Sequence, residues 1–288
     1  MIPSHFNYHN PTNLAQVFAL LSEHAGEAKV LAGGHSLLPM MKFRFAEPTH
    51  LVDLADVAVL KGIKVNDSNL LIGAMSSEND LLRFANMEQL CPLLFKATQL
   101  IADPQVRNRG TIGGDIAHGD PGNDQPAVML ALNAQFHLES SQGKRIVAAD
   151  EFFHGTYQTA LAADELLTAI EIPLEQANKR FGFRKLKRKT GDFATAACAL
   201  TLNFNDGQCS DVRIALTNLA PKSFRAYQAE WLLNNHPLNQ DTIDAAVELA
   251  MRACEPAKDL RGDAQYKTKM AGEMLKRALL DATSSDSQ

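Results

Sequence analysis

The chain has 288 residues, enough for about two domains with hydrophobic cores of native size. Hydrophobic residues make up 45% of it and charged residues 21%, proportions typical of folded soluble proteins, so a disordered, collagenous or coiled-coil chain is excluded. The 33 acidic residues outnumber the 28 basic ones and leave a net charge of −5, so the composition gives no overall attraction to nucleic acid or to an anionic membrane.

Residues 1–53 are predicted to form a small α/β lobe. Apolar residues recur at helical spacing from Leu14 to Leu21, and Gly26 is placed to end that helix. Strands are expected over residues 29–32 and 50–54. The first of these strands runs directly into a pair of glycines.

Residues 54–177 predict a middle α+β lobe that contains one unusual segment. Its predicted strands lie over residues 69–75, around residue 136 and over 166–172, and its predicted helices over residues 78–100 and 126–132. Residues 103–124 are rich in Gly, Asp, Asn and Pro and lack apolar periodicity, which predicts a long polar loop. Long loops inside compact domains are often functional.

Residues 178–288 predict a C-terminal domain made of a three-stranded antiparallel sheet with helices. The strands are expected over residues 181–187, 194–204 and 212–219, and the helices over 226–234, 242–254 and 266–282. The sequence has no internal repeat, and the mixed order of its elements predicts the α+β class.

Neither the cysteines nor the apolar runs indicate a metal cluster or a membrane span. The four cysteines are scattered without a C-x-x-C pair, so we expect reduced core residues of a cytosolic protein and no metal ligands. The first residues show no signal-peptide pattern, and no apolar run approaches the ~20 residues of a transmembrane helix. We therefore expect neither secretion nor membrane insertion.

Two glycine pairs carry the most specific chemical signal in the chain. Gly33 and Gly34 are followed by Ser36, whereas Gly113 and Gly114 are preceded by Thr111. Adjacent glycines can gather several backbone N–H groups into one concavity, and the missing Cβ atoms let a phosphate approach closely.

Each glycine pair alone is typical of a plain structural turn. Two such turns together would hold the diphosphate of a dinucleotide without a lysine, by backbone dipoles. Neither segment matches G-x-G-x-x-G or G-x-x-x-x-G-K-[ST], so the sequence does not support a Rossmann or P-loop site.

The motifs around these glycines also resemble those of a known family. The runs that carry the resemblance are AGGHSLLPMMK (32–42), IADPQVRNRGTIGGD (101–115), DPGND (120–124), KLKRKTGD (185–192) and YKTKMAG (266–272). Over essentially its whole length the chain is similar to the flavoprotein subunits of molybdenum hydroxylases, the xanthine dehydrogenase family, and above all to the medium subunits of aerobic carbon monoxide dehydrogenases. These motifs are specific for FAD binding and much less specific for the substrate.

The resemblance implies a two-lobed FAD-binding fold of the p-cresol methylhydroxylase/vanillyl-alcohol oxidase type. It implies that residues 32–36 and 111–115 surround the FAD diphosphate and that Ile101, Asp124, Leu167 and Lys185 lie beside the cofactor. The residues to which it assigns FAD binding are Ala32, Gly33, Gly34, His35, Ser36, Ile101, Thr111, Ile112, Gly113, Gly114, Asp115, Asp124, Leu167, Lys185 and Phe193. It assigns no catalytic acid, base or nucleophile and no metal ligand to this chain.

Two of these residues have a chemical argument of their own. A lysine near the flavin ring would favour the negatively charged reduced flavin, although residues 184–189 also read as a solvated basic surface. Phe193 stands where relatives often carry Tyr or Trp, and it can pack beside a cofactor without offering a hydrogen bond.

The resemblance implies a role in electron transfer. In such complexes a large molybdenum–pterin subunit oxidises the substrate, here CO and water to CO2 with two electrons and two protons, and a small subunit carries two [2Fe–2S] clusters. The flavoprotein passes the electrons to a quinone-type acceptor. A dimer of heterotrimers is implied, in the cytoplasm or at the inner face of the cell membrane, with no transmembrane segment and no nucleic-acid partner.

Three alternatives remain open at this stage. The chain could be the same subunit of an aldehyde, xanthine or N-heterocycle hydroxylase. It could be a stand-alone flavin oxidase, or a dinucleotide-binding module without redox chemistry.

Overall fold

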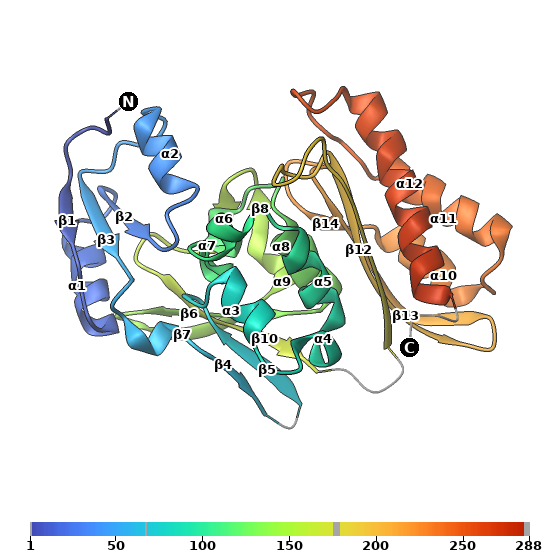
Figure 1. The fold of residues 1–288 in the computed structure, drawn as a ribbon, viewed down its shortest axis with the longest axis horizontal. Coiled ribbons are helices and arrows are strands. Elements are labelled where there is room, and N and C mark those ends of the chain that lie inside the picture. Colours follow the sequence, from blue (N-terminus) through green and yellow to red (C-terminus); the bar gives the residue numbers. More distant parts are fainter. Residues whose placement is uncertain (1, 67, 175–178, 285–288) are drawn as a thin grey trace.

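Three sheets follow one another along the chain, each with a hydrophobic core of its own (Figure 1). The computed structural model describes residues 2–66, 68–174 and 179–284. Among the helices of these residues, none is long and apolar enough to cross a bilayer. The architecture is mixed α/β. In Figure 1, the helices that cover the middle sheet lie between the first sheet and the third.

The first sheet is small and parallel, in the order β1-β3-β2. Its elements are β1 (Asn7–His9), α1 (Leu14–Glu23), β2 (Ala28–Leu31), α2 (Leu37–Lys42) and β3 (His50–Asp53). The Asn13 side chain caps α1 by accepting from the backbone N–H of Gln16, and α1 packs Val17, Phe18 and Leu21 into the core of this lobe. The predicted helix and two strands are confirmed. Strand β1 was not predicted, because three residues are too few for a periodic pattern.

The second sheet is antiparallel and has helices on one face. Its strands run in the order β4-β5-β10-β6-β7. The strands and the 3-10 turn before them are η1 (Ala58–Leu60), β4 (Ile63–Val65), β5 (Asn69–Gly73), β6 (Gln135–Ser140), β7 (Gly143–Ala148) and β10 (Leu166–Pro173), beside the two-stranded sheet of β8 (Phe153–Gly155) and β9 (Gln158–Thr159). The helices are α3 (Glu78–Arg83), α4 (Met87–Leu90), α5 (Pro92–Leu100), α6 (Pro104–Arg107), α7 (Ile112–His118), α8 (Asp124–Ala131) and α9 (Ala149–Phe152).

Two sequence predictions for this lobe are wrong. The single helical stretch over residues 78–100 is three helices, because Asn86 adopts a left-handed conformation (φ +60°) and Pro92 starts a new helix. The segment 103–124 is not a loop throughout, because the side chains of Asp103 and Thr111 cap two short helices, α6 and α7, within it.

The third sheet is antiparallel and lies between two layers of helices. Its strands are β11 (Lys179–Leu186), β12 (Ala196–Asn205), β13 (Gln208–Thr217) and β14 (Phe224–Arg225), followed by α10 (Tyr227–Asn235), α11 (Gln240–Arg252) and α12 (Ala264–Thr283). On one face it contacts α5 and α8 of the middle lobe, and on the other it contacts α10 and α12 (Figure 1). The sheet has four strands where three were predicted, because β14 is only two residues long. The predicted boundary at residues 177/178 lies outside the described residues.

Helix α12 approaches β11 so closely that only glycine fits at one position of the strand. A Cβ atom on Gly182 would overlap the backbone carbonyl oxygen of Ala278 and would lie 2.8 Å from its carbonyl carbon. Because backbone atoms lie on both sides of this contact, no side chain can turn away to make room.

We expect Gly182→Ala to separate α12 from β11 and to lower the free energy of unfolding by about 1–3 kcal/mol, the usual effect of overpacking. Gly155→Ala is the matched control, because its Cβ would be 3.4 Å from the nearest atom, in ordinary contact. Chemical denaturation of both variants checks this, and equal stability of the two would contradict the close approach.

Candidate functional site

The two glycine segments meet in space. Gly33 follows β2 of the first sheet, and a Cβ atom on it would overlap the carbonyl oxygen of Arg109 and lie 2.8 Å from the Cα of Gly110. A Cβ atom on Gly114 would lie 3.2 Å from the Cβ of Ala32. The two segments are therefore in backbone contact, which is the arrangement that the sequence predicted.

The second segment is held by helix α7 and by its packing on the middle sheet. The Thr111 hydroxyl accepts a hydrogen bond from the Gly114 N–H (3.2 Å) and so caps the helix. The Gly113 N–H donates to the Ala74 carbonyl (2.9 Å), and a Cβ on Gly113 would lie 2.6 Å from that oxygen. Ile112 is fully buried in the core of the lobe. Thr111, Ile112 and Gly113 thus fix the backbone of this segment.

The first segment leaves the strand in a turn that requires glycine. Gly34 has φ +78°, a left-handed conformation that residues with a Cβ rarely adopt. Its carbonyl oxygen accepts from the Leu38 N–H (3.0 Å) at the start of α2. Ser36 precedes α2 without a capping hydrogen bond from its hydroxyl, and His35 is exposed. The hydroxyl of Ser36 is therefore not used to cap its own helix.

Lys185 and Asp124 form a buried ion pair next to this region. Lys185 lies on β11 of the third sheet and Asp124 opens α8 of the middle lobe, and their side chains are 2% and 4% exposed. The Lys185 ammonium also donates to the Leu100 carbonyl (3.4 Å). Burial raises the pKa of Asp124, and the nearby Lys185 ammonium acts in the opposite direction. Because Lys185 is buried and paired, the alternative prediction of a solvated surface charge is wrong.

Two further acids lie close to the pair, the buried Glu78 and the half-buried Asp115, and Glu78 was not predicted. Burial raises the pKa of Glu78 to about 8 and that of Asp115 well above its usual range, and the neighbouring carboxylates add to both shifts. Gln125 donates to Glu78 (2.9 Å). One oxygen each of Glu78, Asp115 and Asp124 is buried without a hydrogen-bond partner among the described residues. In the sequence Glu78 reads only as the first residue of a capped helix, so its burial has no local signal.

Ile101 and Leu167 are each next in sequence to a residue whose backbone carbonyl accepts a hydrogen bond at the site, Leu100 from Lys185 and Thr168 from Ala74. Ile101 follows Leu100, whose carbonyl receives Lys185, and its own carbonyl accepts from Arg107 (2.7 Å). Leu167 is 3% exposed and lies on β10 next to an irregularity in the pairing with β6. The next residue along, Thr168, accepts from the Ala74 N–H (3.0 Å), and the Ala74 carbonyl in turn receives Gly113.

Phe193 lies at the protein surface, beside Gly122 of the segment that precedes α8. It is 45% exposed, and a Cβ on Gly122 would be 3.6 Å from its ring. The Arg261 guanidinium lies 5.5 Å from the ring centroid. The ring is therefore placed by contacts on two sides while one side stays open.

These residues fit a dinucleotide cofactor such as FAD. The Gly113 and Gly114 N–H groups already donate within the chain. Among the described residues, no hydrogen bond takes the N–H groups of Gly33, Gly34 and His35, which remain for a diphosphate. The buried oxygens of Asp115 and Asp124 that lack partners suit hydrogen-bond donors of a ligand, and Lys185 supplies a cation.

A hollow of about 560 Å³ lies elsewhere, on the middle sheet beside His137, Lys144 and Arg145. Its two cations are already paired, Lys144 with Glu139 (3.1 Å) and Arg145 with Glu165 (2.6 Å). The hollow therefore suits a phosphate less well than the glycine segments do.

Comparison with known proteins gives a consistent result for both parts of the chain. The family described as FAD binding domain in molybdopterin dehydrogenase matches residues 4–175, and the CO dehydrogenase flavoprotein C-terminal domain matches residues 181–282. The carbon monoxide dehydrogenase medium chain of Hydrogenophaga pseudoflava is 50% identical over 97% of both chains. The nicotine 6-hydroxylase medium subunit of Paenarthrobacter nicotinovorans is 34% identical over 96% of both.

A solved structure is similar over nearly the whole chain. It is that of carbon monoxide dehydrogenase from Hydrogenophaga pseudoflava lacking the Mo-pyranopterin moiety of the molybdenum cofactor, with a TM-score of 0.96, 52% identity and 98% of both chains covered. The resemblance that the motifs predicted is confirmed: the chain belongs to the family of FAD-binding flavoprotein subunits of molybdopterin dehydrogenases, of the carbon monoxide dehydrogenase kind.

Proposed function

We propose that this chain binds FAD and serves as the flavoprotein subunit of a carbon monoxide dehydrogenase complex. In this role it takes electrons from the [2Fe–2S] clusters of a small subunit and passes them to a quinone-type acceptor. The observation that carries the proposal is the contact between the two glycine segments beside the buried pair of Lys185 and Asp124. Bound FAD supplies the capacity to accept single electrons and to hold two.

The backbone of residues 32–36 and 111–115 would hold the diphosphate and the neighbouring ribityl and ribose groups. Ala32, Gly33 and Gly34 offer an approach without large side chains, and the Ser36 hydroxyl remains available because it does not cap α2. Thr111, Ile112 and Gly113 act by fixing the backbone, and Gly114 by leaving room opposite Ala32. His35 would contribute from the exposed side.

Lys185 would favour the reduced, negatively charged cofactor, because an ammonium in a desolvated site interacts with a nearby charge far more strongly than one in water. Asp124 holds the ammonium in place and reduces the local positive charge. Ile101 and Leu167 would give apolar contacts beside the cofactor, Asp115 a buried acceptor, and Phe193 a partly open ring contact at the rim. We propose no catalytic acid or base on this chain.

The substrate would be oxidised on another subunit, CO and water giving CO2, two protons and two electrons. We propose a dimer of heterotrimers with the small iron–sulfur and large molybdenum–pterin subunits, in the cytoplasm or at the inner face of the cell membrane. The finer assignments also remain proposals: a fold of the p-cresol methylhydroxylase/vanillyl-alcohol oxidase type and domains over 1–53, 54–177 and 178–288.

The alternative within the family is the same subunit in a hydroxylase of an aldehyde or an N-heterocycle. The 50% identity to the carbon monoxide dehydrogenase chain, against 34% to the nicotine 6-hydroxylase subunit, favours carbon monoxide. Identification of the subunits that copurify with the chain distinguishes the two.

We expect Gly114→Val to abolish FAD binding, because a side chain at this position would fill the space between Ala32 and Thr111. Gly33→Val should do the same, since it would push Arg109 away. The measurement is FAD per chain, by absorbance and mass spectrometry of the heat-released cofactor. Gly155→Val is the control and should retain FAD. Full FAD occupancy in both variants at the site would contradict the proposal.

Lys185 and Asp124 should shift the flavin potential in opposite directions. Lys185→Met removes the cation and should lower the two-electron midpoint potential by about 30 mV or more, equivalent to about 1.4 kcal/mol. Asp124→Asn leaves the cation uncompensated and should raise the potential. Dye-coupled redox titration measures both, with Lys187→Met, whose ammonium also reaches the Leu100 carbonyl (3.3 Å), as the control. Shifts of the same sign in the two variants would indicate a purely structural role.

A further inference from the structure

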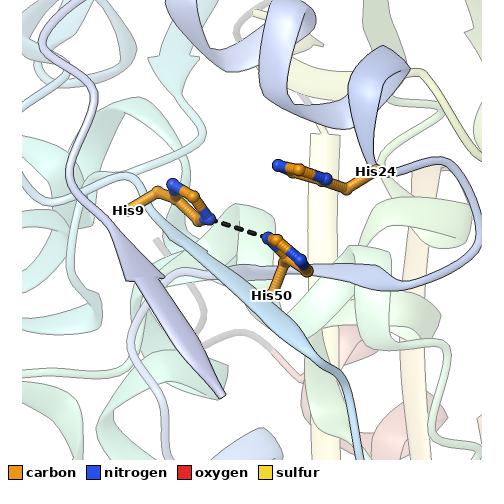
Figure 2. A group of neighbouring side chains, drawn as sticks. All are labelled: His9, His24 and His50. Carbon is orange, nitrogen blue, oxygen red and sulfur yellow. Dashed lines mark hydrogen bonds between the residues drawn. The ribbon is translucent and has the colours of Figure 1, made fainter.

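Three histidines from different elements of the first lobe lie against one another (Figure 2). His9 Nε2 and His50 Nδ1 are 2.9 Å apart, and the rings of His24 and His50 are stacked with their centroids 3.5 Å apart. One ring nitrogen of each histidine lies within 4.8 Å of the corresponding nitrogens of the other two. Three potential ligand atoms are thus gathered in one place.

The fold of the lobe brings these side chains together. Strands β1 and β3 pair in parallel with Asn7 opposite His50 and His9 opposite Val52, so His9 and His50 are diagonal neighbours on one face. Val52 on the same face is buried in the core that α1 covers. His24 ends α1, where its backbone N–H donates to the Leu20 carbonyl. The cluster therefore lies where helix α1 ends over the sheet.

The cluster is separate from the glycine segments. It lies where β2 and β3 begin, since Ala28 is paired with His50, whereas Gly33 follows the other end of β2. A strand of four residues spans about 13 Å, so the two places lie at opposite ends of the sheet.

The surroundings of His50 favour its neutral form, the form that binds metals. Burial lowers the pKa of His50, and so do the adjacent His24 and His9, while Glu27 and Glu23 act in the opposite direction. All three residues are half-buried. Neutral imidazole nitrogens are the ligands that zinc and its neighbours in the first transition row prefer.

We propose that His9, His24 and His50 bind one divalent late transition-metal ion of the zinc, nickel or copper kind. Two nitrogens bound at ~2.1 Å are ~3.0 Å apart at the angle of about 90° common for copper or nickel and ~3.4 Å apart at the tetrahedral angle of zinc. The 2.9 Å between His9 and His50 therefore has to widen by at most ~0.5 Å. The stacked rings of His24 and His50 turn apart on binding, which their half-exposed positions allow. Water completes the coordination. The ion joins β1 and β3 to the end of α1 and so braces the first lobe.

Calorimetric titration of the tag-free full chain with zinc chloride, after treatment with a chelator and dialysis, tests this. The expected result is saturable binding of one zinc ion per chain. His9→Gln, His24→Gln and His50→Gln should each weaken it about tenfold or more, as loss of a ligand does. The controls are His154→Gln and His236→Gln, whose rings hydrogen-bond to the Glu151 and Leu232 carbonyls and lie outside the cluster. Both should bind as the parent chain does.

Two further measurements separate the loss of a metal ligand from damage to the fold. FAD content should be unchanged in all five variants, because the cluster lies away from the glycine segments. Electron paramagnetic resonance of the chain loaded with one equivalent of Cu²⁺ should show nitrogen ligation that is reduced in His24→Gln, a variant at a helix end that disturbs neither strand. No saturable zinc binding by the parent chain, or equal binding by the three cluster variants and the controls, would overturn the proposal.

Discussion

The backbone contact between the two glycine segments is the constraint on which the rest of the site depends. Gly33 belongs to the first lobe, and Arg109 and Gly110 lie between α6 and α7 in the middle lobe, so their contact requires both lobes to be folded and docked. A single added Cβ at Gly33 would overlap the Arg109 carbonyl. The glycines thus let the lobes approach each other. Those of the first segment also leave N–H groups that no hydrogen bond takes among the described residues.

A second constraint is electrostatic and ties the third sheet to the same place. Lys185 crosses from β11 to reach Asp124 on α8, and the ion pair is almost fully removed from water. Burying charges costs several kcal/mol per ion unless geometry and hydrogen bonds compensate, so such a pair is poor evidence for stability and better evidence for a function. Desolvation and the neighbouring Asp124 carboxylate raise the pKa values of Glu78 and Asp115 as well, so this part of the site favours neutral carboxyl groups.

The sequence allowed prediction of the features that depend on local patterns. The glycine turns, helix α1, strands β2 and β10 and the last three helices follow from periodicity and from Gly and Pro. Strand β14 was not predicted, because two residues are too few to show a pattern. Helices α6 and α7 were not predicted, because their capping residues Asp103 and Thr111 lie in a polar stretch that is typical of a loop. The resemblance, and no local pattern, singled out Lys185, because its partner Asp124 lies 61 residues away in the chain. The burial of Glu78 and the proximity of the three histidines arise from tertiary contacts, which leave no local pattern in the sequence.

Hydrogen–deuterium exchange with and without FAD tests the central claim most directly, because backbone amides are the groups that the account assigns to the cofactor. FAD is expected to slow exchange in residues 32–36 and 111–115 together, and to leave exchange in residues 135–148, beside the hollow on the middle sheet, unchanged. Protection of that sheet segment alone, or of only one glycine segment, would contradict the claim.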